Sequence, residues 1–257
     1  MADALLDGKV ALVTGGGSGI GRATALAFAR EGCAGLLVAD RDEAGGEETV
    51  RLVREQSPRT DATFVATEVT RAADADAMVA AAVERWGRLD CAHNNAGISL
   101  QGPSFHELDE RSFDLVISVN VKGVWLGMRS ELRQMLAQGY GSIVNTASAA
   151  SIIGTPGNPA YAASKHAVMG LTRTAAMEHV RDNIRVNAVC PGAIRTPLIT
   201  RFLDVDPGIV ERVTKVQPGG RLGEPEEVAE AVVWLSSDRA SFVTGEGMLV
   251  DGGAVSR

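Results

Sequence analysis

Short apolar runs alternate with longer amphipathic segments along most of this chain. Runs rich in Val, Leu, Ile and Ala predict buried strands, and segments with apolar residues every three or four positions predict helices. We expect strands at 9–13, 35–40, 62–67, 89–93, 142–147, 184–190 and 247–250, and helices at 20–30, 43–55, 72–86, 109–136, 160–180 and 225–234. This alternation predicts a doubly wound α/β fold, a seven-stranded parallel sheet with helices on both faces.

The alternation continues through the 257 residues without an internal repeat, a low-complexity tract or a linker. We therefore expect a single domain over residues 1–257. Residues 195–224 differ from the rest, because prolines and glycines interrupt short apolar and charged pieces there. A long irregular segment of this kind predicts a mobile lid over a substrate.

Composition limits the classes of partner. The formal net charge of -7 is spread along the chain without a basic block, which disfavours nucleic acid and anionic membrane surfaces as partners. No uncharged apolar run approaches membrane-spanning length, and the acidic N-terminus lacks the basic residues of a secretory signal. The three cysteines form no C-x-x-C pair, so we expect reduced, buried thiols and a cytoplasmic protein. The four histidines lack the spacing of a metal site, so no metal is expected.

A glycine-rich turn separates the first predicted strand from the first helix. Gly15, Gly19 and Gly21 would let a pyrophosphate approach backbone N–H groups at the helix N-terminus, although such spacing alone fits a structural turn equally well. Asp40 ends the second strand 19 residues beyond Gly21, close to the position of an acid that binds an adenosine ribose hydroxyl. A carboxylate there favours NAD, whereas Arg41 could bind a 2′-phosphate and leaves NADP as the less favoured alternative.

A second cluster of polar residues lies between Ser148 and Lys165. Tyr161 and Lys165 are four apart at the start of an alanine-rich helix, so both side chains project from one face. We expect the ammonium to lie beside the phenol and to lower its pKa from about 10 toward working pH. Glycines and prolines in the intervening loop let Ser148 return over the same place. As an isolated pair, a Tyr and a Lys at this spacing are more often surface residues, so the assignment to proton transfer depends on the rest of the chain.

Together these motifs closely resemble the short-chain dehydrogenase/reductase family in its single-domain form, over nearly the whole chain. The cofactor turn of that family matches residues 14–21, and its Asn-Asn-Ala-Gly motif matches residues 94–97. Its catalytic Asn, Ser, Tyr and Lys match Asn120, Ser148, Tyr161 and Lys165. One departure is the pair Glu68-Val69, where the family usually has Asp-Val against the adenine.

The resemblance implies a Rossmann-type fold and hydride transfer between a nicotinamide cofactor and a secondary alcohol or ketone. Tyr161 would exchange a proton with the substrate oxygen, Lys165 would lower its pKa and hold the ribose hydroxyls, and Ser148 would hydrogen-bond the substrate oxygen. Asn120 would bind a water that links Lys165 to solvent. The residues expected at the cofactor are Gly15, Ser18, Gly19, Ile20, Gly21, Asp40, Arg41, Glu68, Val69, Asn95, Ala96, Gly97, Tyr161, Lys165, Pro191, Gly192, Ile194 and Thr196.

The expected substrate is a small secondary alcohol or ketone bound in a mainly apolar pocket. Its expected wall consists of Ile98, Ala150, Ile152, Ile153, Ala193, Leu198, Ile199, Phe202 and Leu203. The resemblance also implies a homotetramer, built on the helices after the fourth and fifth strands and on the C-terminal segment. Two alternatives stay open: an NADP-dependent reductase of 3-oxoacyl type, and a dinucleotide-sensing protein that kept the fold but not the reaction.

Overall fold

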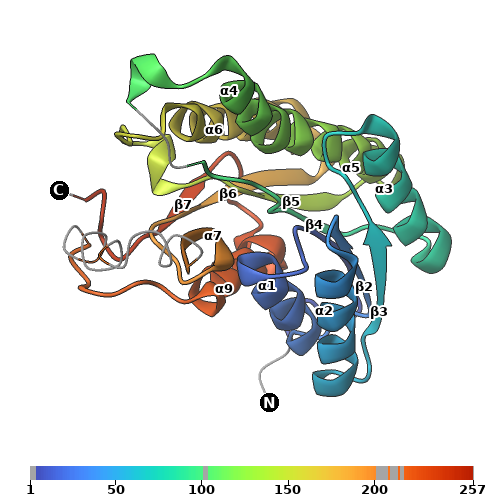
Figure 1. Ribbon diagram of the computed structural model, residues 1–257. Helices are drawn as coiled ribbons and strands as arrows, with labels where there is room; N and C mark the ends of the chain where they lie inside the picture. Colours follow the sequence, from blue (N-terminus) through green and yellow to red (C-terminus); the bar gives the residue numbers. More distant parts are fainter. Residues whose placement is uncertain (1–3, 101–103, 201–207, 209–213, 215–216, 257) are drawn as a thin grey trace.

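Seven strands form one sheet in the order β3-β2-β1-β4-β5-β6-β7, and all neighbouring strands run parallel (Figure 1). The computed structural model describes residues 4–100, 104–200, 208, 214 and 217–256. The strands are β1 (Val10–Thr14), β2 (Gly35–Asp40), β3 (Asp61–Ala66), β4 (Cys91–Asn94), β5 (Gly141–Thr146), β6 (Ile184–Pro191) and β7 (Gly247–Val250). The predicted seven-stranded parallel sheet is confirmed.

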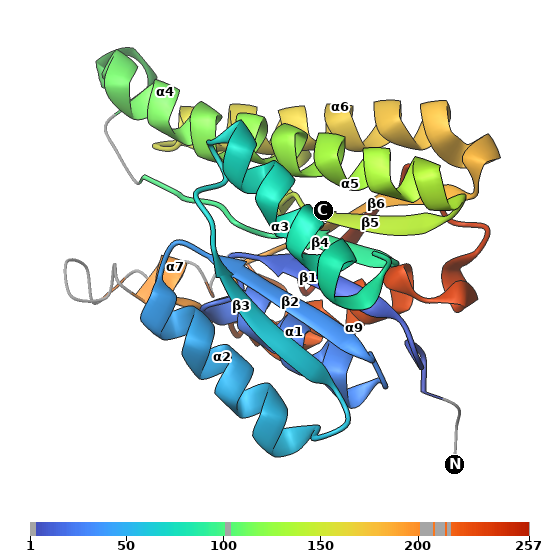
Figure 2. The same ribbon diagram turned by 90° about the vertical axis from the view of Figure 1, so that its right-hand side faces the viewer.

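Helices cover both faces of the sheet (Figures 1 and 2). One face carries α1 (Gly19–Arg30), α2 (Glu43–Gln56) and α9 (Pro225–Ser236), and the other carries α3 (Ala72–Trp86), α4 (Glu110–Ile117), α5 (Val124–Gln138) and α6 (Pro159–His179). The chain passes from β1 outward to β3 and then returns to β4 on the other side of β1. Open sheets of this kind bind ligands where the strand order reverses, beyond the carboxyl ends of the strands.

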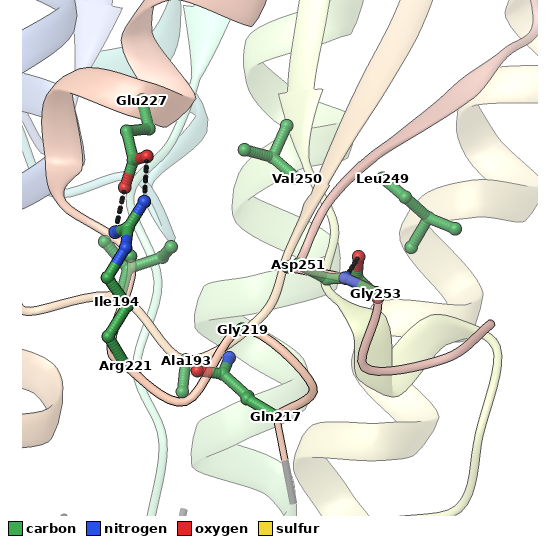
Figure 3. Close-up of a pocket in the computed structure, with 12 residues that line it drawn as sticks. Ala193, Ile194, Gln217, Gly219, Arg221, Glu227, Leu249, Val250, Asp251 and Gly253 are labelled. Carbon is green, nitrogen blue, oxygen red and sulfur yellow. Dashed lines mark hydrogen bonds and ion pairs between the residues drawn. The ribbon is translucent and has the colours of Figure 1, made fainter. Parts of the chain in front are cut away.

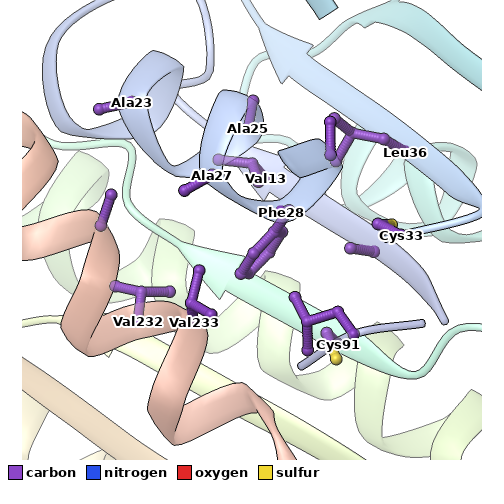
Figure 4. Close-up of a cluster of buried hydrophobic side chains, with 14 of the residues drawn as sticks. Val13, Ala23, Ala25, Ala27, Phe28, Cys33, Leu36, Cys91, Val232 and Val233 are labelled. Atoms are coloured by element: carbon purple, nitrogen blue, oxygen red, sulfur yellow. The ribbon is translucent and has the colours of Figure 1, made fainter. Parts of the chain in front are cut away.

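Alternate residues of each central strand enter two separate apolar layers. In β1, Val13 joins the layer against α1 and α9, whereas Leu12 joins the layer against α3, α5 and α6. Phe28 of α1 is fully buried in the first of these layers (Figure 4). Strands buried on both faces read as nearly continuous apolar runs, which is why the sequence located them within a few residues. The three cysteines are buried free thiols, as expected.

The helix predicted over residues 109–136 is interrupted. Between α4 and α5 the chain forms a π-helical turn, Ser118–Gly123, labelled η2, that contains the fully buried Asn120. A side chain at Gly123 would meet Val69 at 2.9 Å, so only glycine allows this close approach. A turn with i→i+5 bonds holds one more residue than an α-helical turn and is often found at functional sites.

Short helical segments occupy several of the connections between the strands and the longer helices. These are η1 (Phe105–Glu107), η3 (Ala149–Ser151), η4 (Val180–Asp182), η5 (Asp238–Ala240) and α7 (Pro197–Thr200). Part of the predicted lid, with Phe202 and Leu203, lies outside the described residues, and its function as a lid remains a prediction. None of the helices that the structure describes is long and apolar enough to cross a membrane.

A chain of buried polar side chains passes under the carboxyl ends of β4 and β5. The amide nitrogen of Asn94 donates to Glu131 Oε2 at 2.9 Å and to Asn145 Oδ1 at 3.1 Å. Asn145 in turn donates to Thr172 Oγ1 of α6 at 2.9 Å. Glu131 is fully buried, its other carboxyl oxygen has no hydrogen-bond partner among the described residues, and burial raises its pKa from 4.5 to about 7.

This buried carboxyl group predicts a pH-dependent change in stability. The folded protein binds more protons than the unfolded chain between the unfolded pKa of Glu131 and about pH 7, so Glu131 destabilises the fold as pH rises through that window. Glu131→Gln stays neutral at both pH values. We therefore expect its unfolding free energy, measured relative to wild type, to be about 3 kcal/mol higher at pH 8 than at pH 5. Urea unfolding at both pH values measures this difference, with exposed Glu84→Gln as the control. A difference that does not vary with pH contradicts the prediction.

Candidate active site

The loop after β5 and the start of α6 bring Ser148, Tyr161 and Lys165 to one place. Ser148 begins η3, where its Oγ accepts from the Ala150 N–H at 3.1 Å and lies 3.5 Å from the Pro191 carbonyl oxygen at the end of β6. Pro159 occupies the first turn of α6, where its missing N–H costs nothing, and this starts the helix two residues before Tyr161. The predicted helical spacing of Tyr161 and Lys165 is therefore present.

Lys165 is buried, with 4% of its surface exposed, and its Nζ donates to the Thr146 carbonyl oxygen at 2.6 Å. The same Nζ lies 5.5 Å from the centroid of the Tyr161 ring. Removal from water disfavours the ammonium ion and lowers the pKa of Lys165 from 10.5 to about 8. The dipole of the Thr146 carbonyl group stabilises the ammonium form of Lys165.

The expected effect of Lys165 on Tyr161 is wrong for this structure. The pKa of Tyr161 is raised from its ordinary value of 10.0, because burial of the hydroxyl disfavours phenolate, while a hydrogen bond with Ser148 acts in the opposite direction. The ammonium donates to the Thr146 carbonyl and lies over the tyrosine ring. Four-residue spacing correctly predicted a shared helix face, but it does not show which group the long lysine side chain contacts.

Asn120 connects the loop after β4 to the start of α6. Its Oδ1 accepts from the Ile98 N–H at 2.8 Å, and its Nδ2 donates to the Ile98 carbonyl oxygen at 2.9 Å and to Ser164 Oγ at 3.0 Å. Ser164 Oγ donates to the Tyr161 carbonyl oxygen at 2.7 Å. Both amide hydrogens of Asn120 therefore bond to protein groups, and the water relay expected of this residue remains a prediction.

The glycine turn leaves the start of α1 open to an anionic group. Gly15 and Gly19 have positive φ angles of 63° and 51°, and a side chain at Gly21 would overlap the Gly15 carbonyl oxygen. Thr49 Oγ1 donates to the Gly16 carbonyl oxygen at 2.8 Å, which turns that acceptor inward. The helix α1 begins at Gly19, and the side chain of Ser18 makes no capping bond. The first N–H groups of α1 can therefore receive an anionic group, so these residues fit a dinucleotide.

Asp40 lies directly against this turn. Its Oδ2 accepts from the Gly17 N–H at 2.8 Å and its Oδ1 from the Asp42 N–H at 2.9 Å, while the neighbouring Arg41 is exposed. The carboxylate is thus fixed at the carboxyl end of β2, one strand away from the glycine turn. An acid at this place can accept a hydrogen bond from an adenosine ribose hydroxyl.

In the segment after β3, the side chains of Glu68 and Val69 contact other residues of the protein. Glu68 Oε1 accepts from the N–H of Thr70 at 3.2 Å and from its hydroxyl at 3.0 Å. The side chain of Val69 lies against Gly123 in the π-helical turn. Glu68 therefore stabilises its own turn, and its contact with adenine remains a prediction.

The Asn-Asn-Ala-Gly loop lies against the end of β1. The N–H groups of Asn95 and Ala96 donate to Thr14 Oγ1 at 3.0 and 3.2 Å. At Gly97, an added Cβ would lie 3.3 Å from Asn120 Oδ1 and 3.6 Å from Lys165 Nζ. This loop therefore lies between the glycine turn and the catalytic candidates.

The segment after β6 closes the other side of the site. Thr196 lies beside the glycine turn, because a Cβ at Gly19 would meet its Cγ2 at 3.2 Å. The N–H of Gly192 donates to the Val250 carbonyl oxygen at 3.0 Å. The side chain of Ile194 is buried against Gly223 and therefore points inward. Pro191 and Gly192 thus bring Thr196 to the turn, and the candidate nicotinamide segment meets the candidate pyrophosphate segment.

A pocket of about 330 Å³ lies beside this segment (Figure 3). Its lining includes Gln217, Asp251 and the ion pair between Arg221 and Glu227, which has an N–O distance of 2.6 Å. The described residues that line it do not include Ser148 or Tyr161, so it is separate from the catalytic candidates. Of the expected substrate wall, Ile152 and Ile153 are 52% and 47% exposed beside Ser148.

Three polar residues of the site were not predicted from the sequence. Thr146 holds Lys165, Ser164 joins Asn120 to Tyr161, and His93 bonds to Thr146 through its Nε2 at 2.9 Å. The position of Thr146 at the end of an apolar strand, two residues before Ser148, was the available signal. The sequence offers no signal for His93, because its bond joins two strands that are distant in the chain.

Comparisons with known proteins show the family to which the chain belongs. The family model described as Enoyl-(Acyl carrier protein) reductase matches residues 15–255. A 2,5-dichloro-2,5-cyclohexadiene-1,4-diol dehydrogenase of Sphingobium indicum is 43% identical over 249 residues, covering 96% of this chain and 97% of that protein. A cyclohexanol dehydrogenase of Acinetobacter sp. is 42% identical over 249 residues, covering 97% and 96%. The crystal structure of 3-ketoacyl-(acyl-carrier-protein) reductase from Brucella melitensis, complexed with NADH, gives a TM-score of 0.88 at 36% identity, covering 97% of this chain and 99% of that one.

Fold and relatives together define a nicotinamide-dependent oxidoreductase with a doubly wound sheet. The chain belongs to the short-chain dehydrogenase/reductase family. It is an enzyme that transfers a hydride between a nicotinamide dinucleotide and a substrate of the secondary alcohol or ketone class.

Proposed function

We propose that this enzyme is an NAD(H)-dependent dehydrogenase of small secondary alcohols, with ring alcohols as the preferred class. The observation that carries the choice of NAD is the Asp40 carboxylate, which is fixed against the glycine turn by the Gly17 N–H. A carboxylate there binds a ribose diol and repels a 2′-phosphate. Ring alcohols are proposed because the names of two relatives identify cyclohexanol and a cyclohexadienediol as their substrates.

The residues that would hold the cofactor come from five strand ends. The turn at residues 15–21 would receive the pyrophosphate, Asp40 and Arg41 the adenosine ribose, 68–69 the adenine, and residues 95–97 and 191–196 the nicotinamide half. When bound, the nicotinamide ring accepts or supplies the hydride.

The protein would supply and accept the proton of the reaction. The phenol oxygen of Tyr161 would donate its proton to the ketone oxygen in reduction and accept the alcohol proton in oxidation. Ser148 Oγ would hydrogen-bond the same substrate oxygen and stabilise its developing charge. Lys165 would place a positive charge beside Tyr161 and bind the ribose hydroxyls. Asn120 would hold the loop after β4 against the start of α6.

Arg41 supports a second candidate, an NADP-linked reductase of 3-oxoacyl type. Its guanidinium is exposed beside Asp40, where it could bind a 2′-phosphate. One structural relative is a 3-ketoacyl-(acyl-carrier-protein) reductase, although its structure contains NADH. The fixed Asp40 carboxylate is the reason to place NAD first.

We propose a homotetramer in the cytoplasm, with residues 195–224 as the substrate lid. Apolar side chains that are at least 41% exposed on and beside α4, α5 and α6 support a subunit interface there. Three buried free thiols suit a reducing compartment. The exposed apolar residues of these helices are Phe113, Leu115, Trp125, Leu136, Met177 and Val180.

A screen of secondary alcohols with both cofactors tests the proposed function. We expect cyclohexanol and cyclohexane-1,4-diol to be oxidised with NAD at a kcat/KM at least tenfold above that with NADP, because a fixed carboxylate repels the 2′-phosphate. Absorbance of the reduced nicotinamide measures the rates. Preference for NADP, or activity with 3-oxoacyl thioesters but with no ring alcohol, contradicts the proposal.

Removal of the Tyr161 hydroxyl tests the proton-transfer assignment. We expect Tyr161→Phe to lower kcat to below a few per cent of wild type, because the substrate oxygen loses its proton partner, while NADH binding is unchanged. Fluorescence titration of NADH and steady-state rates separate the two effects. The chain has two tyrosines, so Tyr140→Phe is a matched control and should retain its activity. Retention of substantial turnover in Tyr161→Phe would contradict the assignment of Tyr161 to proton transfer.

The raised pKa of Tyr161 determines the direction of the pH profile. Its phenol stays protonated at neutral pH in the free protein, so alcohol oxidation should rise with pH as phenolate forms, whereas ketone reduction should fall over the same range. Rates of oxidation with deuterated alcohol and of reduction with deuterated NADH, each under conditions where hydride transfer is rate-limiting, test this. A flat profile in both directions counts against Tyr161 as the proton donor and acceptor.

A further inference from the structure

His93 is a buried imidazole on β4 that the proposed reaction does not use. It is 0% exposed, and its Nε2 lies 2.9 Å from Thr146 Oγ1 on the neighbouring strand β5. Burial and the nearby Lys165 charge lower its pKa to about 3, so the ring is neutral at working pH. Its Nδ1 has no hydrogen-bond partner among the described residues.

The surrounding bonds identify which ring nitrogen carries the hydrogen. The amide nitrogen of Asn95 donates to the carbonyl oxygens of Thr14 and Gly15 at 3.2 and 3.3 Å, so its Oδ1 is an acceptor. The Thr146 hydroxyl donates to this Oδ1 at 3.3 Å. A hydroxyl has one hydrogen, so Thr146 Oγ1 must accept from His93, which places the imidazole hydrogen on Nε2.

This chain of bonds ends inside the glycine turn. An added Cβ would lie 3.0 Å from Asn95 Nδ2 at Gly15 and 2.7 Å from it at Gly21. The Asn95 amide therefore occupies the space that side chains at these glycines would fill. Thr146 also holds Lys165 through its carbonyl oxygen. One strand residue thus connects the candidate cofactor turn to the candidate catalytic lysine.

We propose that His93 is a positioning residue for dinucleotide binding: its Nε2–H orients the Thr146 hydroxyl, which holds the Asn95 amide in the glycine turn. The proposal rests on the proposed cofactor contacts of residues 15–21. His93 acts through Thr146 and is not a catalytic residue. Its effect should appear in the affinity for the dinucleotide and not in the chemical step.

Two amide substitutions separate the hydrogen bond from packing. In His93→Gln the amide nitrogen can take the place of Nε2, whereas in His93→Asn the shorter side chain places it near Nδ1. We expect His93→Asn to raise the Kd for NADH about tenfold, the effect of one lost hydrogen bond, and His93→Gln to stay within about threefold of wild type. Fluorescence titration gives Kd, and thermal unfolding confirms that both variants are folded. Equal loss in both folded variants overturns the proposal.

A double-mutant cycle tests the path through Thr146. Thr146→Val removes the hydroxyl with little change of shape, so His93→Asn should have almost no further effect on the NADH Kd in that background. Additive losses in the double variant would show that His93 acts independently of Thr146, which overturns the proposal. In a Thr146→Ser background, which keeps the hydroxyl, His93→Asn should still raise the NADH Kd.

A measurement without cofactor keeps the inference separate from the proposed function. In protein labelled with ¹⁵N-histidine, the His93 signals, identified by their loss in His93→Gln, should show a neutral ring with its hydrogen on Nε2 down to about pH 4. A neutral ring that carries its hydrogen on Nδ1, with no hydrogen on Nε2, overturns the proposal. Absence of NADH binding by the wild-type protein would instead refute the proposed cofactor site, and the NMR result would still decide the tautomer.

Discussion

The hydrogen bond between the Lys165 ammonium and the Thr146 carbonyl is the interaction on which the site depends. A cation with 4% of its surface exposed is unfavourable unless polar groups replace the lost water. The Thr146 carbonyl oxygen, 2.6 Å away, is such a group and at the same time fixes α6 to the end of β5. Tyr161 lies one turn earlier on α6, and Ser148 follows two residues after Thr146. The buried charge therefore sets the relative positions of the groups assigned to proton transfer.

The same constraint acts on both faces of the sheet at this edge. On one face Asn94 donates to both Glu131 and Asn145, and on the other Thr146 bonds to both His93 and Asn95. Buried polar groups must find partners within the protein, so each of these residues restricts the position of its neighbours. Polar residues at the ends of adjacent strands thus give a rigid edge from side chains far apart in sequence.

Different parts of the structure were predictable to different degrees. The strands were predictable because strands buried on both faces are continuous apolar runs. The spacing of known motifs singled out Asn120, Ser148, Tyr161 and Lys165, whose catalytic roles remain predictions. The direction of the Tyr161 pKa shift was not predictable, because spacing along a helix does not report burial. The bond between His93 and Thr146 was also missed, since it joins residues 53 positions apart that meet only when β4 and β5 pair.

The π-helical turn that carries Asn120 has a consequence for chain length. It contains one residue more than an α-helical path would need, and each residue of an α-helix turns the chain by about 100°. A deletion of one residue there would let a continuous α-helix join α4 and α5 as they lie, while residues within the turn would shift around the helix axis by up to that angle. The wider turn that directs the Asn120 amide to Ile98 and Ser164 would then be lost. The number of residues in this segment, as well as their identity, is therefore part of the information that builds the site.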